Sequence, residues 1–312
     1  MKQIKHLLLM SILMLLLCFI FGIASCGSRE KSADPYKDGI KILAIGNSFS
    51  RDGMQYLYDM FMQTGTSDSI LLINAYIGGC SLNTHFQNAK NNHAKYTRQM
   101  FGTMGVISKS DSLYTLKALI KEDEWDIITL HQASAFSGIP ETYNADIDSL
   151  IAYVKRHTSN PNVILGWQMT WAYAANSTHR AFPDYNSNQQ EMYDRICNAV
   201  KTKIVPRNDF EFIIPAGTAI QNARLHFGDY LTRDGYHLNN LGCYIVSATW
   251  LKTITGRDLS ELATPYNASA TEVPVTIDKE CLEKIVQSVN AAVEAPFESS
   301  EIVNKSKEKN NK

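Results

Sequence analysis

Two short stretches, far apart in the chain, hold side chains that together could carry out nucleophilic catalysis. Ser48 lies in Gly-Asn-Ser-Phe-Ser, directly after an apolar run from Ile40 to Ile45 and before residues with helical spacing. A serine at such a strand-to-helix turn exposes its hydroxyl beside the free N–H groups of a helix start. Those N–H dipoles can hold the negative charge that develops in acyl transfer. The alternative is that Ser48 or Ser50 only caps the helix.

The second stretch, Asp234-Gly-Tyr-His237, has the spacing of a base and its orienting carboxylate. A carboxylate three residues before a histidine can hold one imidazole nitrogen while the other nitrogen faces a serine. Alone, this stretch could also be a helix start with Asp as the cap and His on the surface. Together with the Ser48 stretch, it predicts a nucleophile, Ser48, a general base, His237, and an orienting residue, Asp234.

These two stretches resemble the SGNH (GDSL-like) hydrolase superfamily, which has an N-terminal Gly-Asp-Ser block and a C-terminal Asp-x-x-His block. Gly46-Asn47-Ser48 matches the first block with Asn in place of Asp, and Asp234 to His237 matches the second in full. More closely, the chain is similar to a Bacteroides-type branch with Gly-Asn-Ser-Phe-Ser near its start and Asp-Gly-Tyr-His-Leu near its end. The resemblance spans roughly Ile40 to Leu259. It implies a three-layer α/β/α, flavodoxin-like fold and a serine esterase that needs no cofactor.

The resemblance also implies an oxyanion hole. Its donors would be the N–H of Ser48, the N–H of a glycine in the second block and a side chain in the third block. Gly79 in Gly-Gly-Cys-Ser is the better match for the glycine, although a glycine pair is also common in ordinary turns. The usual third-block Asn is missing. His131-Gln132 instead resembles sialate O-acetylesterase-like enzymes, so the Gln132 amide is expected to donate; the alternative is that it satisfies a loop backbone. No catalytic role is assigned to His131.

Three further residues are expected to contact substrate, namely Asn47 beside the nucleophile and Gln168 and Trp171 after a predicted strand at 163–168. Open α/β sheets bind ligands at the carboxyl ends of their strands, and an aromatic ring there could stack on a sugar. A packed core is the commoner explanation for any one aromatic residue. The polar segment 83–110 has no clear periodicity, so it could line the cleft or form a solvated excursion.

The elements that must position these residues alternate regularly. Short apolar runs at 40–45, 70–76, 125–130, 163–168 and 210–215 read as strands, and segments with helical spacing separate them. This alternation predicts a five-stranded parallel sheet with helices on both faces.

The N-terminal residues predict where the protein is located in the cell. Basic residues precede an apolar run from Leu7 to Ile23, and Ile-Ala-Ser-Cys26 follows. We therefore expect a lipoprotein signal peptide and lipobox at 1–26, with lipidation of Cys26, although the run is also about long enough for a membrane anchor. A tether at 27–38, a hydrolase domain at 39–265 and a C-terminal extension at 266–312, partly helical with a disordered tail, would follow. The expected location is the bacterial cell envelope, bound to a membrane through the lipid.

Composition excludes some partners. The formal net charge of −1 provides no basic surface for nucleic acid. Cys80, Cys197, Cys243 and Cys281 lack the close spacing of a zinc site, and their pairing as disulfides stays open. The predicted function is an envelope-anchored esterase that removes O-acetyl groups from carbohydrate, with a small-molecule or glycan ester as substrate. The alternative is a catalytically inactive glycan-binding lipoprotein of the same fold.

Overall fold

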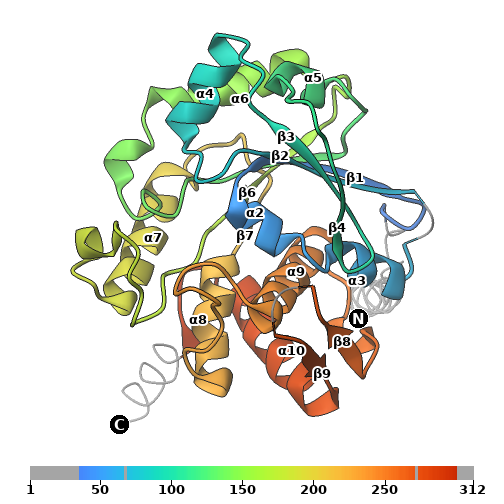
Figure 1. The fold of residues 1–312 in the computed structure, drawn as a ribbon, viewed down its shortest axis with the longest axis vertical. Coiled ribbons are helices and arrows are strands. Elements are labelled where there is room, and N and C mark those ends of the chain that lie inside the picture. The colour runs from blue at the N-terminus through green and yellow to red at the C-terminus, as the bar shows by residue number, and fades with distance from the viewer. Residues whose placement is uncertain (1–34, 67–68, 271–272, 301–312) are drawn as a thin grey trace, which may run out of the picture. The chain divides into compact units, whose positions relative to one another are not determined.

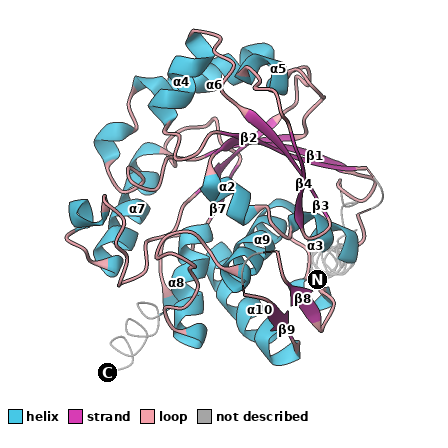
Figure 2. Cartoon of the chain, in the orientation of Figure 1, coloured by secondary structure: helices cyan, strands magenta, loops and turns pink. Residues whose placement is uncertain are grey.

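A central seven-stranded sheet organises the protein (Figures 1 and 2). The computed structural model describes residues 35–66, 69–270 and 273–300, and its contacts separate residues 1–35 from the unit of residues 36–312. All that follows concerns the second unit. The predicted signal peptide, Cys26, most of the tether and the last twelve residues, 301–312, lie outside the described residues.

The strands run in the order β4-β3-β2-β1-β5-β6-β7. They are β1 (Ile40–Gly46), β2 (Ile70–Tyr76), β3 (Thr97–Gly102), β4 (Gly105–Lys109), β5 (Ile127–Leu130), β6 (Ile164–Gln168) and β7 (Phe212–Ile214). The five predicted strands correspond to β2, β1, β5, β6 and β7, which pair in parallel. Strand β1 is central, and all its residues except Lys41 are buried, as expected of a strand covered on both faces.

The prediction of a five-stranded, wholly parallel sheet is wrong at one edge. The polar segment 83–110 supplies an antiparallel hairpin, β3–β4, and β3 pairs with β2. Within β3 and β4, the buried residues are Gln99, Phe101, Gly102 and Gly105. The segment therefore has little of the apolar alternation that marks a strand. Met104 and Gly105 both have positive φ, at 63° and 113°, and make the tight reversal.

Helices cover both faces of the sheet. In Figure 1, α4 (Leu82–Lys90), α5 (Leu116–Ile120) and α6 (Ala145–His157) lie on one side, and α3 (Leu57–Gln63), α8 (Ala216–Phe227), α9 (Asn240–Thr255) and α10 (Lys279–Glu294) lie on the other. The remaining helices are α2 (Ser48–Gly53), α7 (Gln189–Lys203) and short 3₁₀ turns at Pro140–Thr142, Phe182–Tyr185 and Leu259–Glu261. Among the described residues, none of the helices has the length and apolar character needed to cross a membrane.

The segment after the sheet packs on the same unit. Strands β8 (Tyr266–Ala268) and β9 (Val275–Ile277) form a small antiparallel pair, and α10 packs against α8 and α9. Leu282, Ile285 and Val289 are the buried apolar face of α10. The helical part expected in the C-terminal extension thus corresponds to α10.

Parallel pairing determines where the chemistry lies. Strands β1, β2 and β5 run in the same direction, so the loops after Gly46, Tyr76 and Leu130 meet at one edge of the sheet. These loops carry Ser48, Gly79 and Gln132, and the Asp234–His237 stretch comes from the segment between α8 and α9.

Candidate active site

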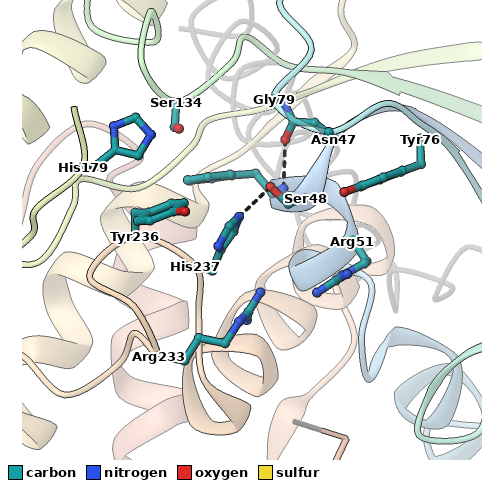
Figure 3. Close-up of a pocket in the computed structure, with 12 residues that line it drawn as sticks. Asn47, Ser48, Arg51, Tyr76, Gly79, Ser134, His179, Arg233, Tyr236 and His237 are labelled. Atoms are coloured by element: carbon teal, nitrogen blue, oxygen red, sulfur yellow. Dashed lines mark hydrogen bonds between the residues drawn. The ribbon is translucent and has the colours of Figure 1, made fainter. Parts of the chain in front are cut away.

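The structure brings Ser48, His237 and Asp234 into one hydrogen-bonded chain. Figure 3 shows the Ser48–His237 part of this chain. The His237 Nδ1–H lies 2.6 Å from Asp234 Oδ2, and Nε2 lies 2.8 Å from Ser48 Oγ. With its Nδ1 proton held by the carboxylate, the imidazole presents the unprotonated Nε2 to the serine hydroxyl. This is the arrangement that a base needs to take the proton of a nucleophile.

Asp234 is held ionised. Burial alone would raise its pKa, but the hydrogen bonds from the His237 ring and from the His237 backbone N–H, 2.7 Å from Oδ1, outweigh burial and lower the pKa below its ordinary value. A fixed carboxylate at this position keeps the ring orientation and stabilises the imidazolium that forms when His237 accepts a proton.

Gly46 allows the chain to turn sharply from β1 into α2. A Cβ at position 46 would lie 2.2 Å from Ser50 Oγ and 2.6 Å from His131 Nε2, which is too close for any side chain. The Ser50 hydroxyl is buried and within hydrogen-bond distance of Asn47 O and Asn74 Oδ1, so it does not face the pocket. Ser48 is therefore the serine of this stretch that is presented to His237.

Asn47, not either serine, caps helix α2. Its side-chain oxygen accepts the Phe49 N–H at 2.9 Å, and its amide donates to Cys80 O at 3.1 Å. It thereby joins the nucleophile turn to the Gly78–Cys80 loop. A carboxylate here would lack the donor for Cys80 O, which gives a physical reason for Asn where the SGNH motif has Asp. Asn47 lines the pocket but both ends of its side chain are engaged.

Two residues of the pocket lining, Ser48 and Gly79, have backbone N–H groups that are available as donors. In the part of the chain that the structure describes, the N–H groups of Ser48 and Gly79 form no hydrogen bond. Gly79 has φ +62°, and a Cβ built there meets nothing within 4 Å, so glycine serves the backbone conformation rather than space. These are the two backbone donors that the sequence predicts for an oxyanion hole.

Gln132 does not come to the site. Its amide donates to Thr142 O and Oγ1, each at 3.2 Å, and its oxygen accepts the N–H groups of Leu82 and Ala133. The side chain is buried and lines no part of the pocket. Its expected oxyanion role does not fit this position, because all of its hydrogen-bonding groups are used by the loop backbone and by Thr142. The alternative, that Gln132 satisfies the backbone of a loop, fits these hydrogen bonds.

Gln168 and Trp171 also lie beneath the pocket rather than in it. Gln168 is buried and donates to Phe49 O, and Trp171 is buried, donates to Tyr236 O and stacks on Phe49 with ring centroids 4.3 Å apart. Their expected contact with substrate does not fit these positions. They support the residues that do line the pocket, namely Phe49 and Tyr236.

A buried ion pair ties the nucleophile helix to the histidine loop. Arg233 contacts both oxygens of Asp52 at 3.2 Å, and Asp52 also accepts the Leu238 N–H at 2.9 Å. The Arg233 backbone N–H donates to His237 O at 2.9 Å. Burial raises the pKa of the Asp52 carboxyl, and the Arg233 guanidinium opposes that rise. Asp52 lies four residues after Ser48, so this pair helps to fix the distance between base and nucleophile.

The pocket around Ser48 has a volume of about 300 Å³. The predicted residues that line it are Asn47, Ser48, Gly79 and His237. Sequence reasoning missed further lining residues, which are Phe49, Arg51, Tyr76, Gly78, Ser134, His179, Arg233 and Tyr236. The sequence carried a signal for several of them. Arg51 follows Ser48 by one helical turn, Tyr76 ends a predicted strand and Tyr236 lies inside the Asp-x-x-His stretch. His179 comes from an irregular segment with no sequence signal.

Two buried histidines lie outside the pocket. His131 donates from Nδ1 to Gln132 O, and burial lowers its pKa to about 4. Burial lowers the pKa of His85 to about 3, and its Nδ1 pairs with the Tyr96 hydroxyl. Both rings are neutral at pH 7 and belong to the core under the site.

Neither cysteines nor metal ligands form a further centre in the described ranges. Cys80, Cys197, Cys243 and Cys281 are free thiols, and the first three are buried. No group of three or more His, Cys, Asp or Glu side chains is placed to hold a metal ion among these residues.

Comparison with known protein families gives a match over most of this chain. A family model described as "Domain of unknown function (DUF4886)" matches residues 41–276. The crystal structure of a DUF4886 family protein from Bacteroides uniformis ATCC 8492 is 35% identical, with a TM-score of 0.75, over 86% of this chain and 99% of the other. Among the curated proteins, none matches this sequence.

Weaker likenesses are found to solved esterases. A carbohydrate esterase family 3 structure from Talaromyces cellulolyticus is 12% identical, with a TM-score of 0.44, over 68% of this chain and 94% of the other. An acetyl xylan esterase, AlAXEase, is 14% identical, with a TM-score of 0.43, over 68% of this chain and 98% of the other. Likenesses of this size carry no argument about activity.

Proposed function

The chain belongs to the DUF4886 family, and we propose that it is an SGNH-type serine hydrolase that cuts carboxylic esters. The observation that carries this proposal is the continuous hydrogen-bonded chain from Ser48 Oγ through His237 to Asp234, at 2.8 and 2.6 Å, inside a pocket. Two unengaged backbone N–H groups beside the serine complete the set of groups that acyl transfer needs.

The mechanism has two halves. Ser48 Oγ attacks the ester carbonyl while His237 Nε2 takes the hydroxyl proton, and the tetrahedral oxyanion accepts hydrogen bonds from the N–H groups of Ser48 and Gly79. His237 then gives the proton to the leaving alcohol, and an acyl-enzyme on Ser48 remains. In the second half, water attacks the acyl carbonyl, again through His237, and the acid and free serine are released. Asp234 stabilises the imidazolium in both halves.

For the substrate, we propose O-acetyl groups on carbohydrate. A pocket of about 300 Å³ is at the small end of ligand sites, which suits a short acyl group and part of the leaving alcohol. The aromatic rings of Tyr76 and Tyr236 and the polar groups of Ser134 and His179 line it together. Aromatic faces and hydrogen-bonding groups in one pocket are the chemistry that binds sugars.

The location is a second part of the proposal. Lipidation at Cys26 would hold the enzyme on a membrane of the bacterial cell envelope, with residues 27–38 as the tether. The basic start, apolar run and small residues before Cys26 support it. Metabolic labelling with a fatty-acid analogue, in the full-length chain and in Cys26→Ala, tests it: the label should be present in the first and absent from the second.

The activity is tested by hydrolysis of 4-nitrophenyl acetate by residues 36–312. Ser48→Ala should abolish turnover, whereas Ser149→Ala, in α6 and outside the pocket lining, should leave it unchanged. Turnover that persists in Ser48→Ala would contradict the proposed nucleophile.

A second candidate is an SGNH-fold protein that binds glycans without cutting them. The observation that favours it is the engagement of Gln132 elsewhere, which leaves the oxyanion site with two backbone donors and no predicted side-chain donor. It predicts that acetylated oligosaccharides bind wild type and are recovered intact after long incubation. The hydrolase predicts release of acetate from the same sugars.

A further inference from the structure

One charged side chain in the pocket wall, that of Arg51, forms a long ion pair with Asp52 but no hydrogen bond within the described residues. Arg51 lies in α2, three residues after Ser48, so the two side chains share a helix face with Cβ atoms roughly 5–6 Å apart. Arg51 lines the pocket, and its side chain is 31% exposed. Its nearest anion is Asp52 Oδ1 at 3.8 Å from Nε, which is beyond hydrogen-bond distance.

The acidic groups around the pocket are already used. Arg233 takes both oxygens of Asp52, and the Leu238 N–H takes a further position on the same carboxylate. Asp234 accepts three hydrogen bonds, from the His237 ring, the His237 N–H and the Tyr236 N–H. The pocket lining contains no Asp or Glu. The positive charge of Arg51 is therefore surplus within the wall.

A second donor lies on the same side of the nucleophile. Figure 3 shows Tyr76 and Arg51 on one side of Ser48, with Ser134, His179 and Tyr236 on the other. Tyr76 lines the pocket, and its hydroxyl forms no hydrogen bond within the described residues. A guanidinium and a phenol hydroxyl, both without protein acceptors, make a wall that donates hydrogen bonds to whatever occupies it.

We propose that Arg51, with the Tyr76 hydroxyl, binds a carboxylate of the substrate, so that the preferred ester carries a negative charge close to the bond that is cut. A guanidinium presents parallel N–H groups that match the two oxygens of a carboxylate. In a concave site its field also concentrates anions. This inference rests on the proposed hydrolase function and narrows its substrate: for a carbohydrate ester, the sugar would be an O-acetylated sugar acid.

Two pairs of synthetic esters test the inference on either side of the scissile bond. The first pair is 4-acetoxybenzoate and its methyl ester, with the charge on the alcohol. The second is mono-4-nitrophenyl succinate and its methyl ester, with the charge on the acid. For each protein the ratio of kcat/KM, charged over neutral, is measured. Comparing that ratio between variants cancels the different intrinsic reactivities of the esters and the fraction of active protein.

In Arg51→Gln, the charged-to-neutral ratio should fall about 10- to 100-fold in at least one pair, as expected from the loss of a charge-assisted hydrogen bond. Arg51→Lys should keep part of the preference. The matched control is Arg156→Gln, which removes the same charge from the exposed surface of α6 and should leave the ratio unchanged. Ratios that agree within twofold between wild type and Arg51→Gln in both pairs would overturn the proposal.

Binding separates this inference from the hydrolase proposal. In a Ser48→Ala background, titration calorimetry should show that 4-acetoxybenzoate binds about tenfold more tightly with Arg51 than with Gln at that position. If wild type cuts none of the esters yet this difference is found, the hydrolase proposal fails and the carboxylate site stands. Equal affinities with Arg51 and with Gln would refute the site, whether or not the neutral esters are cut.

Discussion

Replacing Asp52 by Asn should loosen the connection between the nucleophile helix and the histidine loop. The Asp52 side chain is 2% exposed and that of Arg233 is 18% exposed, so the variant would leave a mostly buried guanidinium without its anion. Removing one member of a buried ion pair costs about 3–5 kcal/mol. The amide oxygen of Asn can still accept the Leu238 N–H, so we expect about 3 kcal/mol, the lower end.

The matched control is Asp123→Asn. Asp123 pairs with Lys41 at 2.7 Å, but the two side chains are 30% and 39% exposed and lie outside the pocket lining. Surface pairs contribute less than about 1 kcal/mol. Urea unfolding, followed by tryptophan fluorescence, gives the free energy of unfolding of both variants and of wild type.

A positioning role demands more than lost stability. If the Asp52–Arg233 pair sets the distance between Ser48 and His237, kcat for 4-nitrophenyl acetate should fall about 10- to 100-fold per folded molecule in Asp52→Asn, with a smaller change in KM. Folded molecules are counted from the unfolding curve at the assay condition. An unchanged kcat per folded molecule would show that the pair only stabilises the fold. A loss of stability as small as that of Asp123→Asn would refute the burial argument itself.

Three more changes test other parts of the site. Gly79→Ala, at φ +62°, should lower the free energy of unfolding by about 1 kcal/mol, which urea unfolding measures. It should also reduce kcat more than it raises KM in steady-state kinetics, because the N–H that holds the oxyanion is displaced. Asn47→Asp removes the donor to Cys80 O and should lower both Tm and kcat, whereas Asn47→Gly, which loses the same contact without adding a charge, should lower kcat less. Burial lowers the pKa of His131 to about 4. As the pH falls below about 6.5, this histidine therefore takes up a proton in the unfolded chain but stays neutral in the folded chain. Stability should therefore fall by about 3 kcal/mol from this residue as pH drops from 6.5 to 4, and the slope of unfolding free energy against pH should be shallower in His131→Asn.

Each of these three has a result that contradicts it. Full kcat in Gly79→Ala would remove that N–H from the oxyanion site. Equal kcat in the two Asn47 variants would show that the added carboxylate does not matter. An unchanged pH slope in His131→Asn would mean that this histidine is not the group that takes up the proton.

The sequence predicted the parts of the fold that have strong periodicity. Five buried strands alternate with amphipathic helices, and parallel pairing then has to place their carboxyl ends together. The loops that carry Ser48 and Gly79 meet for that reason, whereas Asp234 and His237 lie between α8 and α9, outside the strand ends. The β3–β4 hairpin was missed because an edge hairpin buries few residues. The buried Gln99 and Phe101 lie among polar neighbours, so the sequence there shows no alternation of apolar and polar residues.

The expected roles that do not fit the structure, those of Gln132, Gln168 and Trp171, share one physical cause. Residue type and position along the chain do not reveal which hydrogen bonds a side chain already makes. Gln132 had a suitable amide at a suitable loop, but Thr142, ten residues later, takes both of its donors. Gln168 ends strand β6 and Trp171 follows it at the correct edge, yet their side chains donate to the backbone of Phe49 and Tyr236. Arg51 was overlooked for the opposite reason, since only the structure shows that its neighbouring carboxylates are engaged.

The most direct test of the central claim is covalent labelling with a fluorophosphonate probe, followed by mass spectrometry of the labelled peptide. The account predicts one adduct, on Ser48, and a strong decrease in labelling rate in His237→Asn, which removes the ring Nε2. Labelling of any other residue, or equal labelling rates in wild type and His237→Asn, would contradict the assignment of Ser48 as a nucleophile activated by His237.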